Sequence, residues 1–303
     1  MSRYAIGLDI GGTNLKALVV SEEGESLAQI MHPTSEFAHD QGGWISSVKS
    51  LLLSLELVQG KPPECVGIAT PGLVATDGRS IAWMQGRMEI VQGLDWTDAL
   101  HDYGRVPVLN DAHAALLGEV WRGAARGYRN VLLLTLGTGV GGAAMVDGNL
   151  LHGHLGRAGH LGHISLNAHG DLDIVKTPGS LEDAIGECTL PKRGEKRYAS
   201  TAELVKAHLE GDAEATSIWL LSVKELAAGI ASLINAFDPE AILLGGGIAR
   251  AGEPLLTPLE AYLDEFEWRP TGSKVRILPA QLGEWAGAYG AAHHALRSLS
   301  VQG

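Results

Sequence analysis

The chain has 303 residues, of which 45% are hydrophobic, and its mean hydropathy is +0.08. These values predict a folded, soluble protein, and the length favours two lobes over a single core. Acidic residues outnumber basic ones by 35 to 23. The resulting net charge of −12 argues against a nucleic-acid partner, which requires clustered Lys and Arg.

No apolar run approaches the roughly 18 residues that a membrane-spanning helix needs, and no secretory signal precedes the first predicted strand. We therefore expect a cytoplasmic protein without a membrane partner. Cys65 and Cys188 are too few and too far apart for a disulfide framework. The densest basic stretch, residues 192–197, is short and contains an acid, so we expect a solvated loop there.

Strands, turns and helices alternate along the first part of the chain. Residues 4–9 form an apolar strand, the turn Gly11–Asn14 follows, and a strand resumes at 15–20, which predicts a hairpin. The strand ending at Leu109 leads into Asn110 and Asp111, with Asp111 near the N-cap of a helix. Other elements predicted here are a helix at 44–58, strands at 65–69 and 106–109, and a helix at 112–121.

A second strand–turn–strand opens the later part of the chain, at residues 131–146. It repeats the plan of residues 4–20, which is weak evidence for an internal duplication with two similar lobes facing each other across a cleft. Long helical patterns and one more strand follow. They are helices within 201–237 that end at Asp238-Pro239, a strand at 241–244, and a final helix at 284–299. This alternation predicts an α/β protein.

The chain contains 40 glycines, roughly twice the average usage, and many of them lie in three clusters at strand ends. Glycine lets successive backbone N–H groups converge on an anion. We expect Asp9 to hold Mg²⁺ through water, and each cluster to contact the donor. The residues concerned are Gly11, Gly12, Thr13 and Asn14 in the first cluster, Gly137, Thr138 and Gly139 in the second, and Gly245, Gly246 and Gly247 in the third.

Each turn alone is also compatible with a plain hairpin. None carries the Gly-Lys-Ser/Thr of a Walker A loop, and neither of the first two precedes a helix as a dinucleotide fingerprint would. The three clusters together are the stronger signal, because all of them follow strands and one follows a carboxylate. The combination favours phosphate binding.

The chain resembles the sugar-kinase branch of the actin-like ATPase superfamily and, within it, the ROK family (repressors, open reading frames and kinases). The motifs stand in the family's order across almost the whole chain. They are residues 9–13 (Asp-Ile-Gly-Gly-Thr), 67–72 (Gly-Ile-Ala-Thr-Pro-Gly), 109–115 (Leu-Asn-Asp-Ala-His-Ala-Ala), 136–142 (Leu-Gly-Thr-Gly-Val-Gly-Gly), 159–163 (Gly-His-Leu-Gly-His), 179–182 (Gly-Ser-Leu-Glu) and 244–247 (Leu-Gly-Gly-Gly).

This resemblance implies two actin-like ATPase (ribonuclease H-like) α/β lobes around a central cleft. We expect a smaller lobe from residues 1–111 plus 284–303 and a larger one from 112–283. The family's usual minimum is a homodimer. The implied reaction is ATP-dependent phosphorylation of a hydroxyl, the primary 6-type hydroxyl, of a hexose or related sugar or polyol, although polyphosphate would use the same glycine turns.

In the family, the Asp of the Asn-Asp pair takes the proton from the attacking hydroxyl, which assigns that role to Asp111 and makes Asn110 a sugar ligand. A hydroxyl is a poor nucleophile, and a carboxylate about 3 Å away can accept its proton as the P–O bond forms. The alternative is that Asp111 only caps the following helix. The resemblance also places Gly72 against the sugar and Gly245–Gly247 at the adenosine side of ATP.

Several positions depart from the family pattern. His160 stands where the family usually has a sugar-binding Glu, which implies either an altered substrate or weaker binding of the same one. Glu182 matches a Glu that reaches the sugar, unless it is only a helix N-terminal acid. In a stretch unlike that of the glucose kinases, Trp83 and Arg87 either line the pocket or pack within the lobe.

Many ROK proteins hold a structural zinc with the His that corresponds to His163 and with three cysteines. Here the cysteine positions are Asp173, Val175 and Ser180, which lack the soft ligand set that zinc prefers. We therefore expect no zinc site, a loop held by packing, and a His163 that is freer to contact the sugar.

Other functions remain to be weighed. A family repressor carries a DNA-binding domain before the first strand, and with that strand starting at Tyr4 we expect none here. A catalytically silent sugar sensor is the second alternative. A kinase for a cyclitol or amino sugar is the third.

Overall fold

The computed structural model describes residues 3–34, 40–84 and 88–300. By internal contacts the chain divides into two compact units. The first comprises 1–127, 152–158 and 281–303, and the second comprises 128–151 and 159–280. The lobe boundaries at 111 and 284 stay a prediction. In the structure, helix α3 (Asp111–Arg122) groups with the first unit.

Helix α3 belongs with the first unit because small residues let it pack tightly on α9 (Ala286–Ser300). A Cβ on Gly118 would lie 2.3 Å from the carbonyl oxygen of Ala286, and a Cβ on Gly290 would lie 1.7 Å from that of Ala114. Neither position has room for a side chain. The two backbones therefore touch across the helix crossing.

The first unit is built on a five-stranded sheet with the order β3-β2-β1-β4-β7. Its first three strands are antiparallel neighbours, whereas β4 and β7 run parallel to β1. The bounds are β1 Tyr4–Ile10, β2 Asn14–Ser21, β3 Ser26–Pro33, β4 Cys65–Thr70 and β7 Val108–Asn110. The predicted hairpin of β1 and β2 is confirmed, and β3 is an edge strand that the sequence analysis did not predict.

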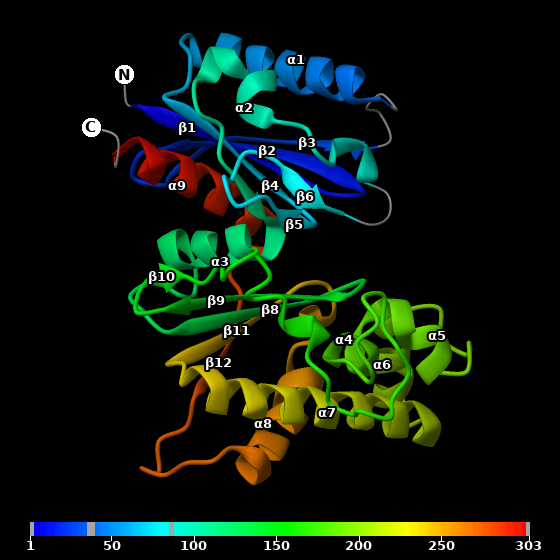
Figure 1. The fold of residues 1–303 in the computed structure, drawn as a ribbon. Coiled ribbons are helices and arrows are strands. Elements are labelled where there is room, and N and C mark those ends of the chain that lie inside the picture. Colours follow the sequence, from blue (N-terminus) through cyan, green and yellow to red (C-terminus); the bar gives the residue numbers. More distant parts are fainter. Residues whose placement is uncertain (1–2, 35–39, 85–87, 301–303) are drawn as a thin grey trace. The chain divides into compact units, whose positions relative to one another are not determined.

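Two helices cover opposite faces of this sheet (Figure 1). On one face, α1 (Gln41–Gln59) buries Trp44, Val48 and Leu52 in a core with the strands, and its predicted range of 44–58 is confirmed within a few residues. On the other face, α9 approaches so closely that a Cβ on Gly7 of β1 would stand 1.9 Å from the carbonyl oxygen of Ala288.

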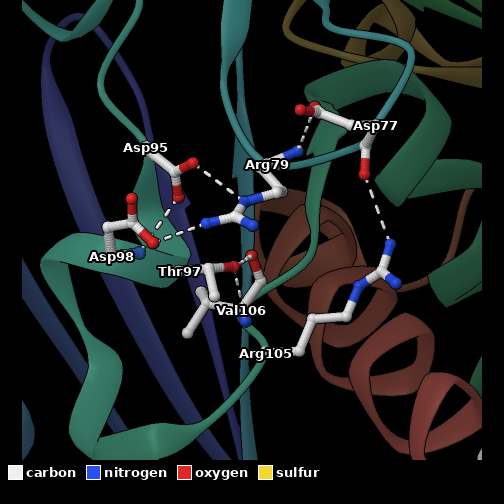
Figure 2. Close-up of polar contacts among 7 residues, drawn as sticks. All are labelled: Asp77, Arg79, Asp95, Thr97, Asp98, Arg105 and Val106. Carbon is white, nitrogen blue, oxygen red and sulfur yellow. Dashed lines mark hydrogen bonds and ion pairs between the residues drawn. The ribbon is translucent and has the colours of Figure 1, made fainter.

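A hairpin of two short strands follows β4, and an arginine in its turn pairs with two aspartates (Figure 2). The strands are β5 (Leu73–Val74) and β6 (Ile81–Trp83). In the turn between them, Arg79 pairs with Asp95 at 2.8 Å and with Asp98 at 2.5 Å. Asp95 is the N-cap of α2 (Trp96–Ala99). Short 3-10 turns at Glu89–Val91 and His101–Tyr103 flank that helix.

The second unit repeats the same sheet plan, with the strand order β10-β9-β8-β11-β12. Again three antiparallel neighbours are followed by two parallel strands. The bounds are β8 Val131–Leu136, β9 Val140–Val146, β10 Asn149–Leu150, β11 Ala241–Gly245 and β12 Arg276–Pro279. The prediction that residues 4–20 and 131–146 follow one plan is confirmed.

Helices α7 and α8 lie on one face of this second sheet (Figure 1). The helices of the unit are α4 Leu181–Ile185, α5 Leu190–Arg193, α6 Thr201–Leu209, α7 Ala213–Phe237 and α8 Glu253–Phe266. By length and composition α7 could cross a membrane. However, 56% of its most apolar 18-residue stretch is buried, and its Trp219 is fully buried in the core. That burial is typical of a core helix.

Candidate functional site

The turn between β8 and β9 carries the second glycine cluster. The N–H of Gly137 donates to the carbonyl oxygen of Gly139 at 2.9 Å, which closes the turn. The carbonyl oxygens of Gly137 and Thr138 accept from the N–H groups of Glu187 and Cys188, at 3.0 and 2.8 Å. Two hydrogen bonds from the 3-10 turn Glu187–Thr189 therefore fix the position of the glycine turn.

Glu182, in the first turn of α4, holds the end of the same turn. Its Oε2 accepts from the backbone N–H of Val140 at 3.0 Å, and the residue is only 9% exposed. A Cβ on Gly139 would lie 2.2 Å from that oxygen, so a larger residue there would displace the Glu182 carboxylate. The assignment of Glu182 to the sugar stays a prediction, and the contact seen in the structure is with the glycine turn.

The third glycine cluster lies at the end of β11, beside the second. Gly246 has φ of +88°, and a Cβ there would meet the carbonyl oxygen of Leu136 at 2.3 Å, so glycine is required for this close approach. At Gly247 a Cβ would have no neighbour within 4 Å. The two clusters therefore converge within the second unit.

A cavity of about 530 Å³ opens at this point of convergence. Apolar side chains of Val205 and Ile248 form part of its wall, and Arg250 contributes a cation. Glu187 accepts from the N–H of Thr201 at 3.0 Å, so its carboxylate is already engaged at the first turn of α6. The lining residues are Gly137, Thr138, Glu187, Ser200, Thr201, Ala202, Val205, Gly247, Ile248, Arg250 and Ala251.

The sequence analysis missed Glu187, Thr201 and Arg250. The start of a helix at 201 was predicted and is confirmed by α6. Ser200 caps that helix and Glu203 accepts from the N–H of Ala199, an arrangement close to a capping box. The basic stretch 192–197 was also only partly interpreted correctly. The prediction of a solvated loop is wrong for Arg193, which donates to Ser222 Oγ at 2.6 Å and to the carbonyl oxygen of Gly186 at 2.8 Å.

The segment of residues 159–163 is seated on β9. A Cβ on Gly162 would stand 1.8 Å from the carbonyl oxygen of Val140, so the 3-10 turn Leu161–His163 lies directly against the strand. His160 and His163 are therefore carried by the same rigid support as the second glycine turn. Both are partly exposed.

A buried carboxylate organises the loop that follows. Asp173 Oδ2 lies 2.8 Å from His163 Nδ1, and its Oδ1 accepts from the N–H groups of Val175 and Thr177. Burial alone would raise the pKa of Asp173, but the hydrogen bonds from Thr177, His163 and Ser180 outweigh it and lower that pKa. The loop is thus held by hydrogen bonds that the sequence analysis did not predict, and His163 is engaged at Nδ1. Its contact with the sugar stays a prediction.

In the first unit, Asp9 is the penultimate residue of β1 and lies against the first turn of α9. Its Oδ2 lies 3.5 Å from Lys16 Nζ, and a Cβ on Gly287 would stand 3.0 Å from its carboxylate. Burial raises the pKa of Asp9 to about 6, with the charge of Asp111 adding to the rise and that of Lys16 opposing it. Asp9 and Asp111 are thus close enough to interact within this unit.

The cap of α3 is Asn110 and not Asp111, contrary to the capping alternative. Asn110 Oδ1 accepts from the N–H groups of Ala112 and His113, and its Nδ2 donates to the carbonyl oxygen of Gly72 at 3.1 Å. Asp111 is the first helical residue. Gly72 has φ of +100° and no room for a Cβ, which would meet the carbonyl oxygen of Trp83 at 2.8 Å.

The first glycine turn joins β1 and β2. The N–H of Gly11 donates to the carbonyl oxygen of Asn14 at 3.0 Å, and Thr34 Oγ1 donates to that of Gly11 at 2.6 Å. A Cβ on Gly12 would enter open space, and Thr13 is exposed. Of the remaining candidates, Trp83 is 48% exposed, and Arg87 lies outside the described residues.

Comparison with known proteins decides what these turns belong to. The model of the ROK family matches residues 5–298. The chain belongs to the ROK family. This ROK chain is 31% identical to the glucokinase of Halalkalibacterium halodurans, over 95% of its length and 93% of the relative's. It is 32% identical to the N-acetyl-D-glucosamine kinase of Haemophilus influenzae, over 80% and 84% of the two chains.

Solved structures agree with this family and with its actin-like ATPase fold. The ROK hexokinase of Thermus thermophilus matches 98% of this chain and 99% of its own, with a TM-score of 0.83 and 30% identity. A ROK glucokinase from Streptomyces griseus, solved with glucose and AMPPNP, matches 97% and 99% at a TM-score of 0.76 and 29% identity. With relatives of this kind across the whole chain, the enzyme class of the ROK protein is that of the sugar kinases.

Asp9 and its surroundings fit Mg²⁺ held through water. Carboxylate oxygens and water are the ligands that Mg²⁺ prefers, and a divalent cation would offset the repulsion between Asp9 and Asp111. Among the residues that the structure describes, no group of three or more His, Cys, Asp or Glu could hold a metal on its own. An ion here would therefore take its other ligands from water and phosphate.

Proposed function

We propose that this ROK protein transfers the γ-phosphoryl group of ATP to a hydroxyl of a hexose, the primary 6-type hydroxyl, with Asp111 as general base. The observation that carries the proposal is the cavity of about 530 Å³ in the second unit. Two glycine clusters that are more than a hundred residues apart in the sequence both line it. One cluster is a hairpin turn and the other follows a parallel strand, and a purely structural role would not require both to line one cavity.

The lining favours a nucleoside triphosphate over polyphosphate as donor. Polyphosphate is a chain of anions and needs cations along its length, whereas Arg250 and the engaged Glu187 are the only charged residues in the wall described above. Apolar contacts from Val205 and Ile248 suit a purine ring and its ribose. Gly137 and Thr138 line the same cavity, and the hydroxyl of Thr138 can donate to a phosphate oxygen.

The reaction requires charge neutralisation at the phosphates and a base at the acceptor. Asp9, Gly11, Gly12, Thr13 and Asn14 are assigned to the phosphates together with Mg²⁺, which supplies neutralisation of phosphate charge when bound. Asp111 accepts the proton of the attacking hydroxyl, and Asn110 holds both the cap of α3 and the Gly72 loop in place.

The sugar is assigned to Gly72, Asn110, His160 and His163. Glucose is the first acceptor to test, because relatives of this chain are glucokinases. An amino sugar is the second, because another relative is an N-acetyl-D-glucosamine kinase. His160 bears on this choice, since imidazole accepts one hydrogen bond and donates one, whereas a carboxylate only accepts. We place the protein in the cytoplasm, as a homodimer.

The test is ADP release measured with MgATP against glucose, N-acetyl-D-glucosamine, N-acetylmannosamine and myo-inositol. We expect release with one of the two hexose classes and none with inositol. Polyphosphate in place of ATP should give no sugar phosphate. Sugar binding without any ADP would instead identify a silent sensor and overturn the proposal, as would release that does not depend on any sugar.

A further inference from the structure

The proposed reaction gives no role to Asp173, although this residue contacts His163. His163 Nδ1 and Asp173 Oδ2 are 2.8 Å apart, with the Asp173 side chain 1% exposed and that of His163 24% exposed. One end of the pair is therefore sealed within the second unit, while the imidazole reaches the surface. A buried carboxylate on one ring nitrogen is the arrangement that orients imidazoles in catalytic and metal sites.

The carboxylate of Asp173 cannot turn away from the ring. Its other oxygen, Oδ1, accepts from the N–H of Val175 at 2.9 Å and from that of Thr177 at 2.8 Å. Both oxygens are thus engaged, and an ionised carboxylate is only an acceptor. The group that faces Oδ2 must donate, so the proton of a neutral imidazole is on Nδ1.

The backbone beneath the ring is fixed as well. Gly162 lies directly against the carbonyl oxygen of Val140, and a Cβ on Gly142 of the same strand would lie 2.7 Å from Leu161 Cβ. The ring of His163 therefore has a seated backbone on one side and the Asp173 hydrogen bond on the other. Because Asp173 engages Nδ1, Nε2 is the ring nitrogen through which this partly exposed side chain can contact a ligand.

We propose that Asp173 is a positioning residue that holds His163 in the Nδ1–H tautomer, so that Nε2 offers a hydrogen-bond acceptor to one hydroxyl of the acceptor sugar. The sugar contact rests on the function proposed above, whereas the tautomer does not. A fixed acceptor obliges that hydroxyl to donate, which sets the direction of the hydrogen bonds around the sugar ring. Asp173 thereby determines specificity without touching the substrate.

The tautomer is tested first, in protein labelled with ¹⁵N in its histidine rings, by long-range ¹H–¹⁵N NMR at pH 8. The His163 signals are assigned by their loss in His163→Gln. We expect the Nδ1–H form in the wild type and in Asp171→Asn, a control on an exposed side chain that pairs with Lys192. A wild-type ring in the Nε2–H or doubly protonated form would overturn the proposal.

Asp173→Asn should reverse the tautomer. The amide oxygen must stay on the N–H groups of Val175 and Thr177, because the NH₂ group cannot accept from them, so the NH₂ donates to His163 Nδ1. The imidazole proton then moves to Nε2, which becomes a donor. A His163 that keeps the wild-type tautomer in a folded Asp173→Asn would contradict the inference.

Kinetics test the sugar contact, with glucose or the acceptor that the ADP screen selects. Asp173→Asn should raise the KM for the sugar about 10–100-fold and leave the KM for ATP unchanged. In a His163→Ala background the same change should have no further effect, since Asp173 acts through that ring. An equal effect in both backgrounds would assign Asp173 to loop structure alone. If no sugar releases ADP, the function fails and the NMR result still decides the tautomer.

Discussion

Glu182 Oε2 accepts a hydrogen bond from the backbone N–H of Val140 at 3.0 Å, where the glycine turn enters β9. Because that N–H is buried, Glu182→Ala leaves it without a partner, at a cost of about 1–3 kcal/mol. We expect the KM for ATP to rise most, since the turn lines the donor cavity. Glu182→Gln, which keeps an acceptor oxygen, is the control and should retain most of the affinity. A rise confined to the sugar KM would instead support the sugar role predicted from sequence.

Asp9→Asn tests the strain of a buried carboxylate. With its pKa raised from 3.8 to about 6, Asp9 binds a proton more tightly in the folded protein than in the unfolded chain. Wild-type stability therefore falls as the pH rises from about 4 to 6, by up to about 3 kcal/mol, and stays lower above pH 6. Asn has no charge to bury, so at pH 7.5 the variant should unfold at a higher urea concentration than the wild type. This difference in the unfolding midpoint should shrink towards pH 4.

The ion pair of Asp9 with Lys16 limits the expected gain in stability. Lys16 loses its partner in Asp9→Asn, which reduces the gain. Asp171→Asn serves as the control, because an exposed substitution usually changes stability by less than about 0.5 kcal/mol. An Asp9→Asn protein less stable than the wild type at pH 7.5 would show that the ion pair with Lys16 outweighs the burial of the carboxylate.

The fold was largely predictable because its signals are local. Apolar strands such as Tyr4–Ile10 are buried almost throughout, and glycine turns mark their ends. β3 was missed because its residues alternate between exposed and half-buried, so its sequence lacks an apolar run. The cap of α3 was placed one residue late, since Asn110 and Asp111 are both good caps and only the backbone decides between them.

The contacts that define the candidate site were less predictable, because they join residues that no sequence period relates. Glu187, in a 3-10 turn, accepts a hydrogen bond from Thr201 at the start of α6. Glu182, in α4, accepts one from Val140 of β9. The sequence analysis described Asp173 only as the residue that stands at the position of a zinc-binding cysteine. Its carboxylate instead makes the hydrogen bond to His163, a contact that depends on how the loop closes.

Asp111→Asn should abolish phosphoryl transfer while leaving the fold intact. A general base contributes about 10²–10⁴-fold to the rate, and the amide cannot accept the hydroxyl proton. The matched control is Glu253→Gln, which removes a carboxylate from the same first position of another helix, α8. Both changes should cost about 0.3–1 kcal/mol of stability through the helix dipole, but only Asp111→Asn should lower kcat. Activity near that of the wild type would remove Asp111 from the base role.

His160→Glu should shift the acceptor preference towards glucose-like sugars. A carboxylate accepts from two hydroxyls, whereas neutral imidazole accepts from one and donates to another. The measurement is the ratio of kcat/KM for glucose to that for N-acetyl-D-glucosamine, and one gained hydrogen bond corresponds to a change of about tenfold. His169→Glu, at an exposed histidine of the same region, is the control. An unchanged ratio would exclude His160 from acceptor selection.

Gly247→Ala separates the needs of the fold from those of the ligand. Gly247 has φ of −64° and ψ of −40°, and a Cβ there would meet nothing within 4 Å. Alanine should therefore fold normally and add about 0.4–1 kcal/mol of stability by restricting the unfolded chain. Because the residue lines the donor cavity, the methyl group should take up nucleotide space and raise the KM for ATP about tenfold, with the sugar KM unchanged.

Gly60→Ala provides the opposite pattern. Gly60 is the C-cap of α1 in the first unit, with φ of +73°, and it is not among the residues that line the cavity, so alanine there is strained by about 1 kcal/mol without altering that lining. Its melting temperature should fall while its KM for ATP stays that of the wild type. If Gly247→Ala binds ATP as well as the wild type does, the third glycine cluster does not contact the nucleotide, and the donor must bind elsewhere than in this cavity.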